Sequence, residues 1–297
     1  MKKAVLLVIF NRPETTLKVL QAIRAVRPSR MYVASDGARE NIEGEKELVE
    51  RVRKLVIDGI DWECEVHTLF RDKNLGCGKA VSGGISWFFE HEKDGIILED
   101  DCLPHEDFFR FCETLLDYYS DEKRVWHISG NNFNKKFRSS ASYYFAQIEH
   151  CWGWATWADR WQSFEYHIKD HKELNYKEAF ARQEVAKYWS DIFQKMEKEQ
   201  DNVWDYQWTY AILKEKGLCI NPSKNLVSNI GVYGVHYSGD DPHLNLPTYE
   251  MGEILHPRRL ELNMKEVEWT YENTFGLKKK TLFRRICVSV TKWLKST

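Results

Sequence analysis

Short apolar strands alternate with amphipathic helices along the first 130 residues, and this alternation limits the possible folds more than any other feature of the sequence. Residues 4–10 form a continuous apolar run, and Pro13 then begins a helical pattern in which apolar residues recur every third position. Further strands are expected at residues 31–34, 64–70, 95–98 and 125–129, with helices between them. Strands joined through helices pair in parallel, because the chain must cross over before it runs in the same direction again. The sequence therefore predicts an α/β fold with a mixed, mostly parallel central sheet flanked by helices.

The second half of the chain has a different pattern and is rich in aromatic residues. Helices are expected near residues 177–200 and 203–216, and four tryptophans between positions 152 and 161 are spaced so that at least three could share one helix face. No repeat or Pro/Gly-rich linker separates the two halves, so a single domain is expected. The predicted organisation is a domain over 1–245 with halves 1–130 and 131–245, a connector over 246–276, and a basic amphipathic helix over 277–297.

Charge and cysteine content exclude several classes of protein. The chain has 43 basic and 45 acidic residues, and this near-neutral balance argues against a nucleic-acid partner. Its seven cysteines form no CxxC pair, so they suit a reducing cytosol better than a disulfide framework or a zinc site. No apolar run approaches the ~20 residues of a membrane-spanning helix, and no signal-peptide cleavage site follows the first apolar stretch. We therefore expect a cytoplasmic protein.

Three consecutive carboxylates, Glu99, Asp100 and Asp101, directly follow the strand at 95–98. In open α/β sheets, ligands bind outside the carboxyl ends of the strands. Adjacent carboxylates repel one another unless a cation or hydrogen-bond donors compensate them. Oxygen ligands on a short turn suit Mg²⁺ or Mn²⁺, which typically binds one or two carboxylates together with waters and diphosphate oxygens. The alternative is a solvated acidic turn before the helix that follows Pro104.

Several short motifs occur in an order that is known from one enzyme family. They are Phe10-Asn11-Arg12-Pro13, Ser35-Asp36-Gly37, Asn74-Leu75-Gly76, Ile97-Leu98-Glu99-Asp100-Asp101, Ile128-Ser129-Gly130-Asn131, Trp152-Gly153-Trp154 and Val203-Trp204-Asp205. Over residues 4–240 the chain resembles glycosyltransferases of the GT-A fold, nearest in motif order to family 2-like enzymes and N-acetylglucosaminyltransferase I. The resemblance implies that residues 1–130 form a nucleotide-binding half and residues 131–245 an acceptor half.

The resemblance also implies roles for residues at the nucleotide-sugar donor. Asp36 would face the nucleotide base, and Arg12 would lie near the uridine or its phosphates. Asp101 would ligate the metal, while Glu99 and Asp100 would contact the ribose or the donor sugar. The other donor-side candidates are Phe10, Asn74, Gly76 and Lys79. Two alternatives stay open at this point, since Asp36 could be a turn residue before Gly37 and Lys79 an exposed lysine of a helix.

Asp205 is the candidate base of the transfer. An inverting sugar transfer needs a group that deprotonates the acceptor hydroxyl as it attacks, and the aromatic residues around Asp205 could desolvate its carboxylate and raise its pKa. The segment is similar to the Trp-Asp-Asp-Trp segment that carries the base in the N-acetylglucosaminyltransferase I type, but Tyr206 replaces the second Asp. The alternative is an acidic residue near the start of a helix, where the helix dipole favours it.

Three further candidates depend on analogy alone. Trp154 and Trp204 would contact the acceptor or donor sugar, although clustered tryptophans are more often core residues. His236 lies in the region where many GT-A enzymes supply a second metal or diphosphate ligand, although a single histidine is usually structural.

The residues and the resemblance together predict a metal-dependent glycosyltransferase that uses a nucleotide-sugar, most simply a UDP-sugar, and the resemblance implies that it inverts. Its acceptor would be a hydroxyl of a surface glycan or a lipid-linked glycan, such as lipopolysaccharide, at the cytoplasmic membrane face. One alternative is a sugar nucleotidyltransferase, which the lack of a Gly-rich loop after the first strand disfavours. Another is a non-catalytic carbohydrate-binding protein, which would account for the aromatic residues but not for the carboxylates.

Residues 277–297 contain seven basic residues and no acidic residue. On a helix, the apolar residues from Leu282 to Leu294, except Val288, fall in an arc of roughly 140°, opposite most of the basic ones. This pattern is typical of a helix in an anionic membrane interface, and we expect peripheral binding to the inner face of the cytoplasmic membrane. A helix docked on the domain needs the same apolar stripe but not the one-sided charge.

Deleting residues 277–297 is expected to release the protein from anionic liposomes, because the deletion removes both the apolar stripe and the positive charge. Hydrolysis of a soluble nucleotide-sugar should be unchanged. Co-sedimentation with phosphatidylglycerol vesicles measures the binding, and neutral phosphatidylcholine vesicles provide the control. Equal sedimentation of the full-length and shortened proteins with anionic vesicles would contradict the prediction.

Overall fold

The first strand, β1 (Ala4–Ile9), is buried along its whole length, and the central sheet is built around it. The structure is a computed structural model and describes residues 1–198, 202–231, 233–234, 237–238 and 241–279. The sheet has eight strands in the order β3-β2-β1-β4-β8-β6-β9-β7. The other seven strands of this sheet are β2 (Arg30–Ser35), β3 (Glu65–Phe70), β4 (Asp94–Glu99), β6 (Val125–Ser129), β7 (Tyr143–Ala146), β8 (Trp154–Trp157) and β9 (Leu218–Pro222).

Six of these strands run in one direction, and two run against them. The pairs β1–β2, β2–β3, β1–β4 and β6–β9 are parallel, whereas β8 pairs antiparallel with both β4 and β6. Because β8 separates β4 from β6 and opposes both, β4 and β6 point the same way. Only β7, at the edge beside β9, and β8 oppose the rest. The expected α/β fold with a mixed, mostly parallel sheet is confirmed.

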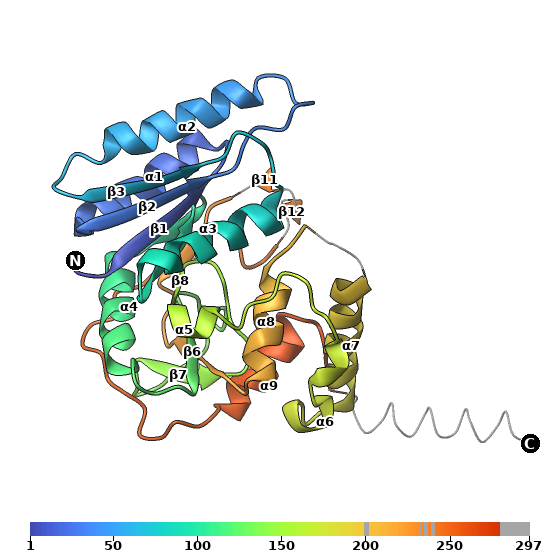
Figure 1. Ribbon diagram of the computed structural model, residues 1–297. Helices are drawn as coiled ribbons and strands as arrows, with labels where there is room; N and C mark the ends of the chain where they lie inside the picture. Colours follow the sequence, from blue (N-terminus) through green and yellow to red (C-terminus); the bar gives the residue numbers. More distant parts are fainter. Residues whose placement is uncertain (199–201, 232, 235–236, 239–240, 280–297) are drawn as a thin grey trace, which may run out of the picture.

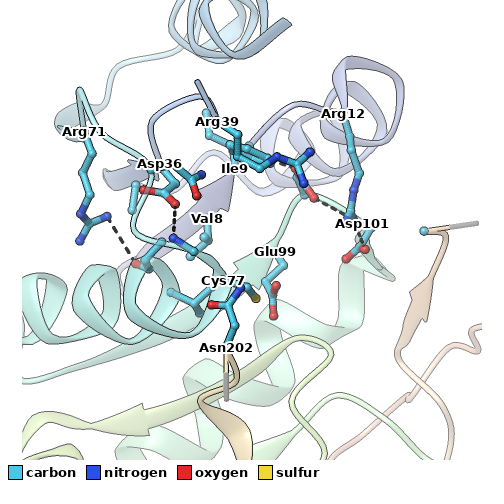
Figure 2. Close-up of a pocket in the computed structure, with 18 of the residues that line it drawn as sticks. Val8, Ile9, Arg12, Asp36, Arg39, Arg71, Cys77, Glu99, Asp101 and Asn202 are labelled. Carbon is cyan, nitrogen blue, oxygen red and sulfur yellow. Dashed lines mark hydrogen bonds and ion pairs between the residues drawn. The ribbon is translucent and has the colours of Figure 1, made fainter. Parts of the chain in front are cut away.

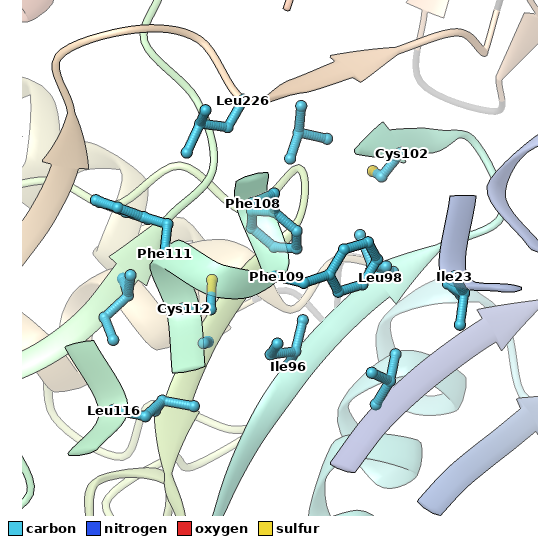
Figure 3. Close-up of a cluster of buried hydrophobic side chains, with 14 of the residues drawn as sticks. Ile23, Ile96, Leu98, Cys102, Phe108, Phe109, Phe111, Cys112, Leu116 and Leu226 are labelled. Atoms are coloured by element: carbon cyan, nitrogen blue, oxygen red, sulfur yellow. The ribbon is translucent and has the colours of Figure 1, made fainter. Parts of the chain in front are cut away.

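Helices cover both faces of the sheet (Figure 1). One face is covered by α1 (Pro13–Val26), α2 (Glu45–Gly59) and α4 (Glu106–Tyr118), and the other by α3 (Cys77–His91), α5 (Ala158–Trp161) and α8 (Asp205–Lys214). Alternate residues of β1 pack on opposite faces, since Val5 and Leu7 join the first cluster while Leu6 and Val8 join the second. Figure 3 shows part of the first cluster, where Phe108 and Phe109 of α4 pack against Leu98 of β4.

A third cluster lies beside the sheet and joins the last part of the chain to the domain. It gathers apolar residues of α7 (Gln183–Lys198), α8 and α9 (Met264–Asn273), including Trp189 and Phe193. The remaining short elements are β5 (Cys102–Pro104), η1 (His171–Glu173), α6 (Tyr176–Ala179), β10 (Val227–Asn229), β11 (Tyr233–Gly234) and β12 (Tyr237–Ser238). β5 directly follows the acidic triplet in the chain and pairs antiparallel with β10.

Residues 246–276, expected as a connector, pack against the domain in the structure. Met251 belongs to the first core cluster, and Val267 and Tyr271 of α9 belong to the third. Leu262 forms a bridge with Phe145 of β7. Of the predicted basic helix over 277–297, residues 280–297 lie outside the described part of the chain. Among the described residues, no helix has the length and apolar character needed to cross a membrane.

Two local predictions for the second half are wrong. Trp154 and Trp157 belong to strand β8, so the tryptophans between 152 and 161 do not share a helix face. The apolar residues of β8 are buried from both sides of the sheet, and a short buried strand cannot be distinguished from a helix segment by its apolar pattern alone. The helix expected over 177–200 is divided into α6 and α7, with Phe180–Arg182 between them.

Candidate functional site

A pocket of about 230 Å³ opens at the carboxyl ends of β1, β2 and β4 (Figure 2). From β1 the chain builds β2 and β3 on one side, and then returns to place β4 on the other side of β1. The strand order thus reverses between β1 and β4, and such a switch point leaves a crevice between the diverging connections. The lining residues are Val8, Ile9, Phe10, Arg12, Ala34, Asp36, Arg39, Arg71, Asn74, Gly76, Cys77, Ala80, Val81, Glu99, Asp100, Asp101, Trp152, Asn202, Asn229 and Gly231.

The structure brings most of the predicted donor-side residues together at this pocket. The predicted residues that line it are Phe10, Arg12, Asp36, Asn74, Gly76, Glu99, Asp100 and Asp101. They come from the carboxyl end of β4 and from the loops that follow β1, β2, β3 and β4. Their convergence follows from the parallel pairing, because the carboxyl ends of parallel strands lie at one edge.

Arg12 holds two carboxylates of the acidic triplet. Its Nη1 donates to Oδ1 of Asp100 at 3.2 Å and forms a closer ion pair with Oδ2 of Asp101. The other oxygen of Asp100 accepts a hydrogen bond from the backbone N–H of Phe10 at 3.0 Å. Burial opposes the charge on Arg12, but Asp100 and Asp101 raise its pKa above the usual value. The guanidinium therefore acts as a resident positive charge at the triplet.

Glu99 differs from its two neighbours because its carboxylate has no hydrogen-bond or ion-pair partner among the described residues. Its carboxylate points into the space beside Cys77 (Figure 2). Burial, followed by the charges of Asp101 and Asp100, raises the pKa of Glu99 well above its usual value. Burial likewise raises the pKa of Asp100, although Arg12 opposes this shift. The pocket thus concentrates negative charge that the protein compensates only in part.

Asp36 has a structural role that the sequence left open. Its carboxylate accepts hydrogen bonds from the backbone N–H groups of Gly37, Leu75 and Gly76, each at 3.0 Å. Burial nevertheless raises its pKa, because these hydrogen bonds offset only part of the desolvation. Asp36 therefore ties the end of β2 to the turn before α3, at the same time as it lines the pocket.

The turn before α3 is held closely by its neighbours. Asn74 donates from Nδ2 to the carbonyl oxygen of Gly37 at 2.7 Å, and Asn202 accepts from the N–H of Gly78 at 2.8 Å. Gly76 has φ +81°, and a Cβ there would lie 2.6 Å from Oδ1 of Asn202. Only glycine fits this position without strain. The turn can therefore present its backbone to a ligand in a fixed geometry.

Two arginines of the pocket were missed by the sequence analysis. Arg39 pairs with Glu45, and its guanidinium lies 5.7 Å from the centre of the Phe10 ring. The side chain of Arg71 has one weak hydrogen bond, from Nη1 to the carbonyl oxygen of Ala80 at 3.4 Å, and no ion pair within the described residues. Burial lowers the pKa of Arg71, against the opposing effect of Asp36. Arg71 directly follows the strand expected at residues 64–70, so the strand-end argument made for the acidic triplet could also have selected it.

Other lining residues come from distant parts of the chain, and no local signal marks them. Asn202 precedes α8, while Asn229 and Gly231 follow the domain's last long strand. A Cβ on Gly231 would lie 2.4 Å from Oδ2 of Asp101, so this loop packs directly against the triplet. One tryptophan, Trp152, also lines the pocket.

Lys79, Trp154 and Trp204 do not line the pocket. Lys79 is exposed on α3, and its Nζ lies 5.9 Å from the centre of the Tyr166 ring. Trp154 and Trp204 are 1% and 4% exposed and stack on each other with ring centres 5.6 Å apart. The structure thus places both indoles in the core, where a sugar has no access to them, and the packing of α8 on the sheet explains their burial.

Asp205 is the first residue of α8 and lies outside the pocket lining. Its charge contributes to the raised pKa values of Glu99 and Glu149, so it lies near both carboxyl groups. Thr209 connects this region, because its hydroxyl contacts the carbonyl oxygen of Asp205 at 3.1 Å and Oε1 of Glu149 more closely. The second oxygen of Glu149 is buried without a partner within the described part of the chain. Burial raises the pKa of Glu149 to about 7.

His236 lies outside the described residues. A different group of possible metal ligands, Asp170, His171 and Glu197, lies within 4.8 Å of one another away from the pocket. His171 already pairs through Nδ1 with Glu197, and Asp170 caps the short helix η1 by accepting from the N–H of Lys172. These contacts account for the group as an ion pair and a helix cap.

Comparisons with known proteins do not assign this chain to a family. No protein-family model matches the chain, and no curated protein matches it. Among solved structures, HddC from Yersinia pseudotuberculosis shares 10% identity with a TM-score of 0.34, over 55% of this chain and 80% of that one. A UDP-glucose pyrophosphorylase complexed with UDP-glucose has 10% identity and a TM-score of 0.34, over 71% and 97%. The glycosyltransferase GlyE of Streptococcus pneumoniae TIGR4 has 10% identity and a TM-score of 0.35, over 74% and 45%. Similarity at this level establishes no shared function.

Asp36→Asn is expected to lower the free energy of unfolding by about 1–3 kcal/mol, because the amide nitrogen would face backbone donors that the carboxylate now accepts from. Urea denaturation measures the change. Asp72→Asn is the matched control, since Asp72 is exposed and close in the chain. Equal stability of the two variants would show that Asp36 does not hold the turn before α3.

The stability of the protein is expected to fall as the pH rises from about 4.5 to 7. In this window the folded state holds a proton on Glu149 that the unfolded chain releases, so the ionised form must be buried at higher pH. The shift corresponds to a contribution on the order of 3 kcal/mol. In Glu149→Gln this contribution should be absent, whereas Glu14→Gln, at an exposed position, should follow the wild type. Denaturation midpoints that depend on pH equally in all three proteins would contradict this assignment.

Proposed function

We propose that this protein transfers a sugar from a nucleotide-sugar, most simply a UDP-sugar, to a hydroxyl of a glycan or lipid-linked glycan. The observation that carries the proposal is the pocket at the switch point, where the acidic triplet and three arginines face one cavity. Arginines suit phosphate oxygens, and carboxylates suit a divalent cation. A metal-bound nucleoside diphosphate combines both charges in one ligand, which fits this arrangement better than an uncharged substrate does.

The oxygen donors of the triplet fit Mg²⁺ or Mn²⁺. Glu99 has no partner within the described residues, and the Arg12 ion pairs show that Asp100 and Asp101 together accept a positive charge. Asp101 and Glu99 would hold the ion, with phosphate oxygens and water completing its shell. When bound, such an ion stabilises the negative charge that develops on a leaving diphosphate.

The arginines would bind the donor phosphates. Arg71 is the strongest candidate, because it lines the pocket without an ion-pair partner among the described residues. Arg12 is already paired with the triplet and would reach the phosphates only while it shares or gives up Asp101. Asp36 keeps its three backbone hydrogen bonds, and its remaining acceptor capacity could receive an N–H of the base.

In the proposed transfer, the bond between the sugar C1 and the diphosphate oxygen breaks and a bond from the acceptor oxygen to C1 forms. The acceptor hydroxyl gives its proton to a base, and the electron pair of the broken bond leaves with the diphosphate. Asp205 stays the predicted base, and its charge contributes to the environment of Glu99 and Glu149. A GT-A type of fold, inversion at C1 and a setting at the cytoplasmic membrane face belong to the same proposal.

A sugar nucleotidyltransferase is the second candidate, because the same pocket suits a nucleoside triphosphate. Such an enzyme would join a sugar phosphate to the nucleotide and release pyrophosphate. The connection from β1 to α1 contains only Phe10, Asn11 and Arg12, without the Gly-rich loop that would wrap a triphosphate. The two activities differ in product, so one assay separates them.

Incubation with single nucleotide-sugars and Mn²⁺ is expected to release free nucleotide for at least one donor. Asp101→Asn should lower this rate about 100-fold or more, because it removes a carboxylate that would hold the cation needed to stabilise the leaving diphosphate. The matched control is Asp121→Asn at an exposed position. Pyrophosphate formation from a nucleoside triphosphate and a sugar 1-phosphate would favour the nucleotidyltransferase. No turnover and no thermal shift with any donor would contradict both proposed activities.

A further inference from the structure

A second cavity of about 490 Å³ lies at the same edge of the sheet as the first pocket. Its walls come mainly from the loops after β6 and β9, which run in the same direction as β1 and β4. The volume is in the range of roughly 300–1,000 Å³ that is typical of ligand sites. The lining residues are Asn132, Asn134, Lys135, Phe137, Arg138, Ser139, Ser223, Lys224, Asn225, Leu246, Pro247, Tyr249 and Glu250.

The floor of this cavity is held rigidly by two buried asparagines. Asn132 donates from Nδ2 to the carbonyl oxygen of Pro222 at 2.8 Å, and its N–H donates to Oδ1 of Asn225 at 3.1 Å. Asn225 donates in turn to the carbonyl oxygens of Val227 and Pro247, at 2.8 and 3.2 Å. These bonds join three separate loops, so the cavity is formed before any ligand arrives.

The rim carries three cations that lack acidic partners. Arg138 donates to the carbonyl oxygens of Lys135 and Phe137, and Lys224 donates to the carbonyl oxygen of Glu250 at 2.7 Å. Among the described residues, none of these cations forms an ion pair, and the side chain of Lys135 makes no polar contact at all. The carboxylate of Glu250 also lines the cavity, so three positive charges stand against one negative charge. A cavity of this composition attracts an anion.

The cavity also offers surfaces that suit a sugar ring. Tyr249 is 48% exposed and lines the cavity together with Pro247 and the buried side chain of Leu246. An exposed aromatic ring can cover the apolar C–H face of a sugar, while neighbouring donors bind its polar substituents.

The two cavities are neighbours along one segment of chain. Asn225 lines the second cavity, and Asn229, four residues later, lines the first. Four residues span at most about 14 Å. The backbone N–H groups of Asn245 and Tyr249 donate to the carbonyl oxygens of Asn229 and Asn225, so a second segment follows the same path.

From these observations we propose that the second cavity binds an acidic saccharide, and that this saccharide is the acceptor. The sugar would carry a carboxylate or a phosphate, which Lys135, Arg138 and Lys224 would neutralise. The acceptor role depends on the proposed transferase function, because it places the receiving glycan next to the donor pocket. Binding of the acidic saccharide itself does not depend on that function.

The experiment measures the binding of three probes to the full-length protein by saturation-transfer NMR. The probes are methyl glucuronoside, glucose 6-phosphate and the neutral methyl glucoside, which separate the carboxylate from the phosphate and both from the sugar ring. The variant combines Lys135→Gln, Arg138→Gln and Lys224→Gln. The matched control is Lys136→Gln, an exposed neighbour that does not line the cavity.

The wild type and Lys136→Gln are expected to bind at least one charged probe about tenfold more tightly than the neutral one, and the triple variant should lose this preference. Uridine diphosphate binding, measured in parallel, should be equal in all three proteins. If uridine diphosphate binds none of them, the proposed function fails while the charged probes still test this site. Equal binding of charged and neutral probes, no binding of any probe, or unchanged binding in the triple variant would overturn the proposal. Equal thermal stability of the variants excludes loss of folding as the cause.

Discussion

The parallel pairing of β1 with β4 is the constraint on which the rest of the site depends. The register places Val8 beside Glu99, so both strands end at the same level of the sheet. The residues that follow them, Phe10 and Asp100, then meet through a hydrogen bond from the backbone N–H of Phe10 to the carboxylate of Asp100. Because the chain has filled the other side of β1 with β2 and β3, the loops diverge at this point and leave the pocket between them.

The pocket contains more negative charge than a protein can bury without compensation, and the structure shows where the compensation comes from. Arg12 is delivered by the loop after β1, directly opposite the triplet after β4. Asp36 is satisfied differently, by the N–H groups of the turn before α3. Glu99 has neither kind of partner among the described residues. A site that leaves one carboxylate without compensation is suited to a ligand that brings a positive charge.

Much of the fold and of the pocket at the ends of β1, β2 and β4 could be predicted, because the relevant signals are local. A short apolar run followed by polar residues marks a buried strand and its end, and this pattern places Asp36 and Glu99 at strand ends. Arg71 lacks this mark, because β3 has no continuous apolar run, and only its position after an expected strand points to it. Trp154 and Trp157 show where local patterns fail, since spacing that permits a helix face is also compatible with a short buried strand.

The sequence by itself determined the α/β class, the position of the strand ends and the residue types that gather there. Only the tertiary structure decided what those residues do. It showed that Arg12 pairs with Asp100 and Asp101, that Asp36 holds a turn, and that Trp154 and Trp204 are core residues. It also brought Asn202 and Asn229 to the pocket and formed a second cavity at the ends of β6 and β9. The physical reason is that strand formation depends on neighbours in the chain, whereas burial, ion pairing and cavity shape depend on residues that are distant in sequence.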